Sequence, residues 1–213
     1  MNTQDVPSPI DLRNPQDALA WANEVNIKRP WRYEFFDYYV ELINQLKRNK
    51  SSSEEYIQVL EIGSGPGFLA KHLLSQCQNI VYIATDFSEA MHELSKSKLL
   101  ENELERTTHF IADFKNKNWR EQLAQYDVVI IHQALHELRH KDHATNFHQE
   151  IKSLLKPNAI YLVCDHIYAP DAMKNNELYM SKLEHFQSLE AAGYTNIELV
   201  KEMKGLCLFL CKL

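Results

Sequence analysis

The sequence lacks the features that mark membrane, secreted or nucleic-acid-binding proteins. No apolar run in its 213 residues is long enough to span a bilayer, and residues 1–16 do not show the basic-then-apolar order of a secretory signal. Lys and Arg number 23 against 29 Asp and Glu, and this net charge of −6 gives no general attraction to nucleic acid. We therefore expect a cytoplasmic protein that binds no membrane, and the charge disfavours nucleic acid as a partner.

Cysteine is scarce as well, and its spacing argues against structural cross-links. The four cysteines lie mostly in apolar runs, and no two of them have Cys-x-x-Cys spacing: Cys77, Cys164, Cys207 and Cys211. This pattern favours buried, reduced thiols over a disulfide framework or a zinc site. We expect no bound metal.

The residues that are present predict one α/β domain with an N-terminal helical cap. A polar stretch, Asn49 to Ser53, separates a cap segment (residues 1–53) from the main body (residues 54–213). Asn14-Pro15 is a suitable start for a first helix. After Pro30, apolar side chains recur at helical spacing and predict a second helix.

Beyond residue 53, short β-branched runs alternate with amphipathic stretches, which is the pattern of βαβ units and a largely parallel sheet. The expected strands are Tyr56–Ile62, Ile80–Thr85, Thr107–Ala112, Asp127–Ile131, Ala159–Cys164, Asn196–Lys201 and Leu206–Cys211. The expected helices are Gly67–Gln76, Ser88–Lys98, Trp119–Ala124, Asp142–Leu155 and Asn176–Ala192. The linker between the last two strands is too short for a parallel crossover, so this pair should be antiparallel.

A glycine-rich loop follows the first predicted strand. Residues 59–67 read Val-Leu-Glu-Ile-Gly-Ser-Gly-Pro-Gly, and glycine allows a ligand to lie against bare backbone. A dinucleotide fingerprint would have its third small residue at position 68, where this chain has Phe68. The carboxylate of Glu61 would repel a pyrophosphate, whereas it suits a ligand that carries an ammonium and a sulfonium.

Acidic residues follow the next two predicted strands, at the sheet edge where open α/β folds bind ligands. Asp86 comes about twenty residues after the loop, where a carboxylate can accept hydrogen bonds from both hydroxyls of a ribose. Phe87 could pack against adenine, and Asp113 could accept a hydrogen bond from the adenine amino group. Each residue also has an ordinary structural interpretation, because Asp86 could cap the helix near Ser88 and Asp113 could be a turn residue.

These motifs together resemble those of the class I S-adenosylmethionine-dependent methyltransferases. The first motif of that family is an acidic residue followed by Gly-x-Gly-x-Gly, here Glu61, Gly63, Gly65 and Gly67. The family's ribose-binding and adenine-contacting positions correspond to Asp86 with Phe87 and to Asp113 with Phe114. Residues 126–138 are similar to its fourth-strand motif, which brings His132 toward the cofactor, and residues 154–159 resemble the approach to its fifth strand, with Asn158 where glycine is common.

The resemblance implies S-adenosylmethionine as the cofactor. It also implies a three-layer Rossmann-like fold, in which a seven-stranded, mostly parallel sheet has an antiparallel last strand.

Three histidines are candidates for a catalytic base. His132 ends the fourth predicted strand, His136 follows one helical turn later, and His166 follows the fifth strand. Histidine titrates near neutral pH and can take a proton from a methyl acceptor. The His132-x-x-x-His136 spacing also admits a metal, although a third ligand is missing. Alternatively, His136 packs or hydrogen-bonds within its loop.

Aromatic residues are concentrated in the N-terminal segment after Pro30. Trp31 and Tyr33 are candidates for the wall of an acceptor pocket, in which case deletion of residues 1–50 would remove most methyl transfer but keep much of the affinity for S-adenosylhomocysteine. Alternatively, rings such as Phe36 and Tyr39 complete the core, and the deletion would destabilise the domain.

The sequence therefore predicts an S-adenosylmethionine-dependent enzyme that methylates an oxygen or nitrogen of a small molecule. This small-molecule methyl acceptor is the expected partner. Two alternatives stay open. One is a non-catalytic S-adenosylmethionine-binding regulator or partner subunit, and the other is an RNA methyltransferase.

Overall fold

The computed structural model describes residues 4–48 and 55–213, and its strands form one sheet in the order β3-β2-β1-β4-β5-β7-β6. This order, with β7 antiparallel to its neighbours, confirms the predicted seven-stranded, mostly parallel sheet. The chain divides into two compact units. The first unit is Ile10–Asp113, and the second contains Phe114–Leu213 with the stretch that ends at Pro9. The predicted loop around Ser53 lies outside the described residues.

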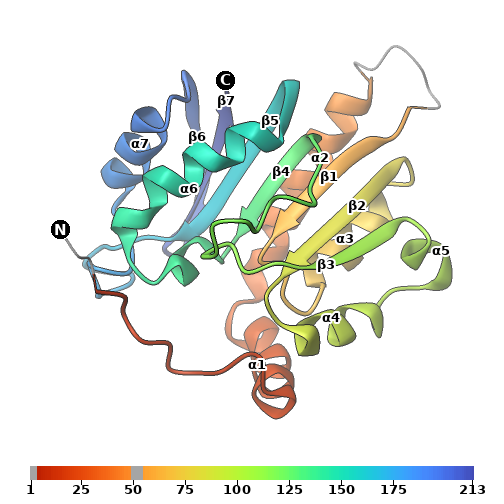
Figure 1. Cartoon of the computed structure of the whole chain (residues 1–213), viewed down its shortest axis with the longest axis horizontal. Helices are drawn as coiled ribbons and strands as arrows, with labels where there is room; N and C mark the ends of the chain where they lie inside the picture. The colour runs from red at the N-terminus through yellow and green to blue at the C-terminus, as the bar shows by residue number, and fades with distance from the viewer. Residues whose placement is uncertain (1–3, 49–54) are drawn as a thin grey trace. The chain divides into compact units, whose positions relative to one another are not determined.

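The first unit combines the N-terminal helices with the first three strands. Strands β1, β2 and β3 are parallel and run side by side (Figure 1). In chain order, the elements are α1 (Pro15–Lys28), η1 (Pro30–Arg32), α2 (Tyr33–Arg48), β1 (Ile57–Ile62), α3 (Phe68–Gln76), β2 (Ile80–Asp86), α4 (Glu89–Lys96), α5 (Glu101–Leu104) and β3 (Thr107–Ile111).

Both predicted N-terminal helices are present, for reasons that the sequence contains. The side chain of Asn14 caps α1 by accepting hydrogen bonds from the backbone N–H groups of Gln16 and Asp17, and Pro15 occupies the first turn. Helix α2 buries one face at helical spacing, formed by Phe35, Phe36, Tyr39 and Ile43. Three aromatic side chains of α2, Phe35, Phe36 and Tyr39, are therefore part of the core of the first unit.

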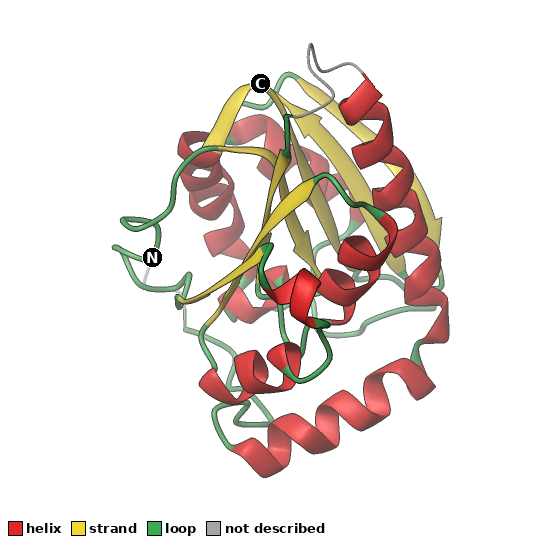
Figure 2. Ribbon diagram, turned by 90° about the vertical axis from the view of Figure 1, so that its right-hand side faces the viewer, coloured by secondary structure: helices red, strands yellow, loops and turns green. Residues whose placement is uncertain are grey.

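The second unit contains the remaining four strands. Strand β5 is parallel to β4, and β7 is antiparallel to both β5 and β6. In Figure 1, α6 lies in front of β5, and Figure 2 shows helices in red beside the yellow strands. In chain order, the elements are β4 (Tyr126–His132), η2 (Leu135–Leu138), η3 (Lys141–His143), α6 (Ala144–Ile151), η4 (Lys152–Leu154), β5 (Leu155–His166), α7 (Lys182–Ala191), β6 (Asn196–Met203) and β7 (Leu206–Lys212).

Residues with positive φ mark the turns of this unit. Lys204 and Gly205, at φ 47° and 77°, form the two-residue connection of the β6–β7 hairpin, a geometry that matches strand twist. Asn158, which stands where the resembling family has glycine, lies within β5 and adopts φ 64°, a conformation that asparagine tolerates better than most residues. The pairing of β4 with β5 is irregular beside it, so the expected turn is a local irregularity of the strand.

Three predicted helices differ from the structure. Residues 119–124 form turns in which N–H groups reach back three residues, so the helix predicted there is wrong. Trp119 holds this segment, because its buried ring stacks on Phe147 and its Nε1 donates to Glu150 at 2.7 Å. The helix predicted over Asn176–Ala192 is shorter, because α7 begins only after its cap at Ser181. The helix predicted over Asp142–Leu155 is divided into η3, α6 and η4, and its last residue belongs to β5.

All four cysteines are free and buried, as their spacing predicts. Burial raises the pKa of the Cys77 thiol to about 11 and that of Cys207 to about 12.

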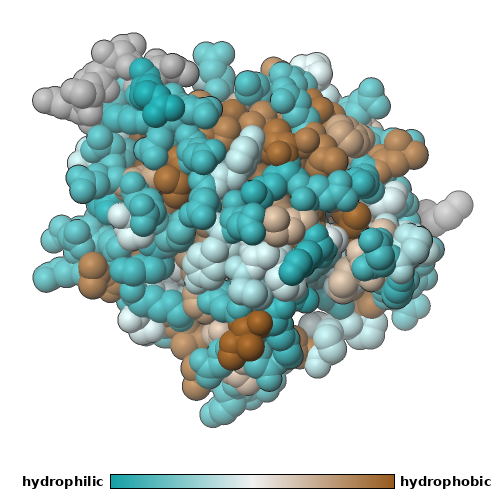
Figure 3. All heavy atoms as spheres, turned by 180° about the vertical axis from the view of Figure 1, so that it is seen from behind, coloured by the Kyte–Doolittle hydropathy of each residue, from teal (hydrophilic) through white to brown (hydrophobic). Residues whose placement is uncertain are grey.

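In the described ranges, 4–48 and 55–213, no helix has both the length and the apolar character needed to cross a bilayer. Hydrophilic residues cover most of the face in Figure 3, and hydrophobic residues gather mainly in its upper part.

Candidate active site

The glycine loop between β1 and α3 is left-handed at each predicted glycine. The φ angles of Gly63, Gly65 and Gly67 are 68°, 53° and 76°. A Cβ on Gly67 would lie 2.2 Å from Oγ of Ser95, whereas a Cβ on Gly65 would meet nothing within 4 Å. Gly67 is thus required by packing inside the protein. At Gly65 the bare backbone borders open space, which fits the predicted approach of a cofactor.

Asp86, at the end of β2, holds this loop in place. Its Oδ2 accepts a hydrogen bond from the N–H of Gly65 at 2.8 Å, and its Oδ1 accepts one from the N–H of Ser88 at 2.9 Å. Ser88 itself caps α4 through its side chain. Asp86 thus orders the loop and the start of α4, and its contact with the two ribose hydroxyls stays a prediction.

Glu61 lies at the start of the loop in a buried position, and Tyr82 Oη donates a hydrogen bond to its Oε2 at 2.6 Å. Burial raises the pKa of Glu61 to about 8, although the hydrogen bond from Tyr82 and the positive charge of Arg32 both lower it. The side chain is therefore mostly protonated at pH 7. A bound cation would favour its ionised form, so the charge assigned to Glu61 from the sequence depends on the ligand.

Phe87 and Asp113, the two residues predicted to contact adenine, share a partner in the first unit. The guanidinium carbon of Arg13 lies 4.5 Å from the centroid of the Phe87 ring. Its Nη2 lies 3.3 Å from Oδ2 of Asp113. Arg13 thus makes the two contacts, with Phe87 and with Asp113, that the sequence predicts for adenine.

His136 and Asp165 form the central ion pair of the second unit. Nδ1 of His136 lies 2.7 Å from Oδ1 of Asp165, and the backbone N–H of His136 donates to Oδ2 at 2.7 Å. The backbone N–H of His166 also donates to Oδ1. Burial would raise the pKa of Asp165, but the ring of His136 and the contacts with His166 outweigh it and lower that pKa to about 2.

The same pair changes the titration of His136. Burial lowers the pKa of this histidine, but the charge and hydrogen bond of Asp165, together with Glu137, reverse the effect, and the pKa is raised. Oε1 of Glu137 lies 3.6 Å from Nε2 of His136. Because Asp165 accepts at Nδ1, the proton of neutral His136 resides there and Nε2 carries the lone pair. This is the arrangement of an oriented general base.

His166 adjoins this pair, with its ring centroid 5.9 Å from that of His136. The side-chain amide of Gln133 donates to Nε2 of His166 at 2.9 Å. Gln133 itself has φ 55°, a conformation that is uncommon for residues other than glycine and that recurs at functional sites. His132 is buried at the end of β4, and its contact with a cofactor stays a prediction.

Sequence reasoning named His136 and His166 as separate candidates but gave no role to Asp165. The signal was available, because Asp165 is the carboxylate that ends an otherwise apolar, buried run in β5. A buried carboxylate needs partners that donate hydrogen bonds to it. The two candidate bases supply these donors.

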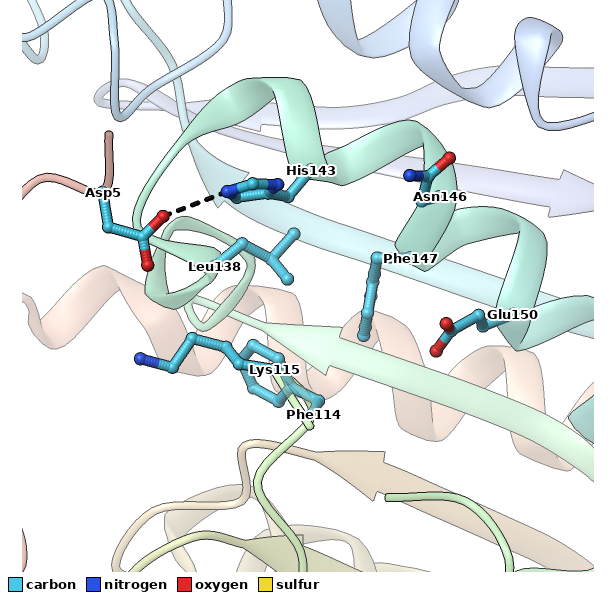
Figure 4. A pocket seen from close by; sticks show the side chains of 8 residues that line it. All are labelled: Asp5, Phe114, Lys115, Leu138, His143, Asn146, Phe147 and Glu150. Carbon is cyan, nitrogen blue, oxygen red and sulfur yellow. Dashed lines mark hydrogen bonds and ion pairs between the residues drawn. The ribbon is translucent and has the colours of Figure 1, made fainter. Parts of the chain in front are cut away.

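Phe114 lines a cavity of about 330 Å³ in the second unit. Its ring centroid lies 5.4 Å from that of Phe147, and two other lining residues, Asp5 and His143, pair at 3.0 Å (Figure 4). The cavity therefore has both aromatic and charged lining residues. A role of Phe114 in cofactor binding stays a prediction.

Tyr33 and Trp31, the predicted acceptor-pocket residues, belong to the first unit. The hydroxyl of Tyr33 accepts a hydrogen bond from Asn26 at 3.2 Å, and its ring packs edge-on against Phe36 and His72. This environment is that of a residue that joins α2 to α3. Contact of Trp31 or Tyr33 with an acceptor stays a prediction.

Comparison with known proteins places these features in context. Residues 59–158 match a family described as a methyltransferase domain. A malonyl-[acyl-carrier protein] O-methyltransferase of Priestia megaterium is 34% identical over 90 residues, which are 42% of this chain and 30% of the relative. This chain thus matches less than a third of the length of that curated relative.

Solved structures share the fold. The CMeT domain of the citrinin polyketide synthase superposes with a TM-score of 0.71 at 12% identity, over 93% of this chain and 57% of that chain. A structure described as the DhpI–SAH complex superposes with a TM-score of 0.61 at 18% identity, over 94% of this chain and 95% of that chain.

Proposed function

We propose that this chain, which belongs to the class I S-adenosylmethionine-dependent methyltransferases, methylates an oxygen or nitrogen of a small molecule that loses a proton in the reaction. S-adenosylmethionine supplies a methyl group bound to a sulfonium sulfur, and this sulfur leaves readily as a neutral thioether. The residues that fit this cofactor lie in the first unit, where the open backbone at Gly65 and the carboxylate of Asp86 border the glycine loop. The observation that carries the proposal is the His136–Asp165 pair.

In the proposed reaction, the oxygen or nitrogen of the acceptor forms a bond to the methyl carbon while the methyl–sulfur bond breaks. Nε2 of His136 takes the proton that the acceptor loses. Asp165 acts through His136, because it fixes the Nδ1 proton and stabilises the imidazolium that results. An acidic hydroxyl or a protonated amine uses such a base, whereas an acceptor with a free lone pair and no proton to lose does not. The geometry therefore favours acceptors that still carry a proton at neutral pH, such as phenols and protonated amines. A carboxylic acid has already lost its proton there and needs no base.

The proposal is tested by measuring S-adenosylhomocysteine release with a panel of phenols, carboxylic acids, amines, thiols, acyl-carrier-bound acids and RNA. We expect turnover with a small-molecule phenol or amine. His136→Gln should lower turnover by about 10²- to 10⁴-fold, the usual contribution of a general base, with unchanged binding of S-adenosylhomocysteine. His72→Gln, a histidine on α3 that pairs with Asp37, is the matched control.

Calorimetry should show binding of S-adenosylmethionine and S-adenosylhomocysteine but not of nicotinamide dinucleotides. Binding without turnover on any acceptor would favour the regulator alternative, and turnover on RNA alone would favour the RNA methyltransferase. The opposite ligand preference would contradict the cofactor assignment.

A further inference from the structure

The chain segment before α1 is attached to the loop that follows β2. Oγ of Ser88 donates a hydrogen bond to the backbone carbonyl of Leu12. The backbone N–H of Arg13 donates to the side chain of Asp11 at 3.0 Å, and Asn14 caps the helix that follows. The Ser88–Leu12 hydrogen bond thus attaches this segment near the end of β2, and the local contacts of Asp11 and Asn14 order the backbone on both sides of Arg13.

The side chain of Arg13 has the properties that an adenine base would present at this position. Its guanidinium is planar, as adenine is, and it lies over the Phe87 ring at 4.5 Å. It also directs an N–H toward Asp113, as the amino group of adenine would. A base stacked on the same face of Phe87 would need the space that the guanidinium fills.

We propose that Arg13 is a built-in competitor for the adenine-binding position, and that it must leave Phe87 and Asp113 when the cofactor binds. This inference rests on the proposed function, because it takes Phe87 and Asp113 as the adenine contacts. Release of Arg13 also frees one anchor of the segment before α1. Cofactor binding is thereby coupled to the placement of the N-terminal helix.

The strength of the contacts that Arg13 makes with Asp113 and Phe87 sets how much its removal should change the affinity for the ligand. The Arg13 side chain is 60% exposed and that of Asp113 is 21% exposed, so their ion pair is weakened by solvent. The contact with Phe87 adds a modest attraction between a cation and a ring. A ligand that binds only the open form has an apparent affinity reduced by the open fraction. Removal of Arg13 should therefore tighten binding by about threefold to thirtyfold.

The test is calorimetric titration of the whole chain with S-adenosylhomocysteine and, separately, with adenosine. Arg13→Ala should tighten both by the same factor, because adenosine contains only the part of the ligand that competes with Arg13. Lys28→Ala, at the other end of α1, removes the same charge from an exposed i,i+4 pair and should leave both affinities unchanged. Arg13→Gln serves as a second variant if Arg13→Ala does not fold.

Salt gives an independent readout. Raising ionic strength screens the Arg13–Asp113 pair, so it should tighten adenosine binding to the parent protein and not to Arg13→Ala. Weaker binding by Arg13→Ala would overturn the inference and make Arg13 a cofactor contact, and equal binding would overturn it as well. If no folded variant, including the parent, binds S-adenosylhomocysteine, the proposed function fails, and that result is distinct from either of these outcomes.

Discussion

The carboxylate of Asp165 accepts hydrogen bonds from both the backbone N–H and the ring Nδ1 of His136, each at 2.7 Å. Two contacts to one residue fix the position of the imidazole as well as its tautomer. The donor positions come from the short helix after β4, and the acceptor comes from the end of β5. Because β4 and β5 are paired in register, the sheet itself keeps the base and its partner aligned.

Asp165→Asn should change the pH profile of turnover as well as its rate. Only neutral His136 acts as a base, so parent activity should rise as pH rises through the raised pKa of His136. In Asp165→Asn the main causes of that raised pKa are absent, and the rising limb should move to lower pH. The maximal rate should fall by about a hundredfold or more, because a neutral amide stabilises the imidazolium less and its NH2 group can donate to Nδ1, which favours the wrong tautomer.

Rates measured between pH 5 and 9 would check this expectation, with Asp17→Asn in the exposed first turn of α1 as the control. A profile that keeps its position while the rate falls would mean that Asp165 has only a structural role.

Glu61 predicts a link between cofactor binding and proton release. Its pKa of about 8 makes it largely neutral at pH 7, and a ligand cation nearby would favour the ionised form. Affinity for S-adenosylmethionine should therefore increase as pH rises toward 8, by at most about tenfold per unit. Calorimetry in buffers with different ionisation enthalpies measures the protons released. Glu61→Gln should release none, and a parent that releases none would show that Glu61 does not face the cation.

Two glycines of the loop should respond differently to the same substitution. Both have positive φ, which costs an alanine about 1 kcal/mol. Gly67→Ala also places its Cβ 2.9 Å from Cα of Ser95, and this overpacking should raise the total cost to about 2–4 kcal/mol. Gly65→Ala has open space and is the matched control for stability. Denaturant unfolding checks the difference, and equal losses would show that the loop relaxes away from Ser95.

Most strands could be predicted because they are short apolar runs that end at polar or turn residues, whereas β3 and β6 are mixed in character. The failure at residues 119–124 has a different origin, since the position of that segment is set by Trp119 through its contacts with Phe147 and Glu150, about thirty residues away in the sequence. The partnership of His136 and Asp165 was not predictable from local pattern for the same reason. These two residues are 29 positions apart in the sequence and come into contact only when β4 and β5 pair.

Loss of the N-terminal helices should destabilise the protein, in contrast to a cap that only closes an acceptor site. Phe36 and Tyr39 are fully buried in the first unit. Phe36→Ala should cost about 3–5 kcal/mol, as for other buried aromatic residues. Leu19→Ala, at a position that is 48% exposed on α1, should cost far less.

A chain that starts at residue 55 should then lose cooperative thermal unfolding. If it unfolds like the parent and only turnover is lost, the packing role assigned to α2 is wrong.

The alkylation rates of the four buried thiols report how fast the structure around each of them opens. A thiol reacts as its thiolate, and burial together with a raised pKa keeps Cys77 and Cys207 almost unreactive in the folded protein. Alkylation therefore proceeds only as fast as the surrounding structure opens. Cys77 belongs to the first unit, whereas Cys164, Cys207 and Cys211 belong to the second. Mass spectrometry of timed alkylation would thus show, from native residues alone, whether the two halves of the chain open together or one before the other.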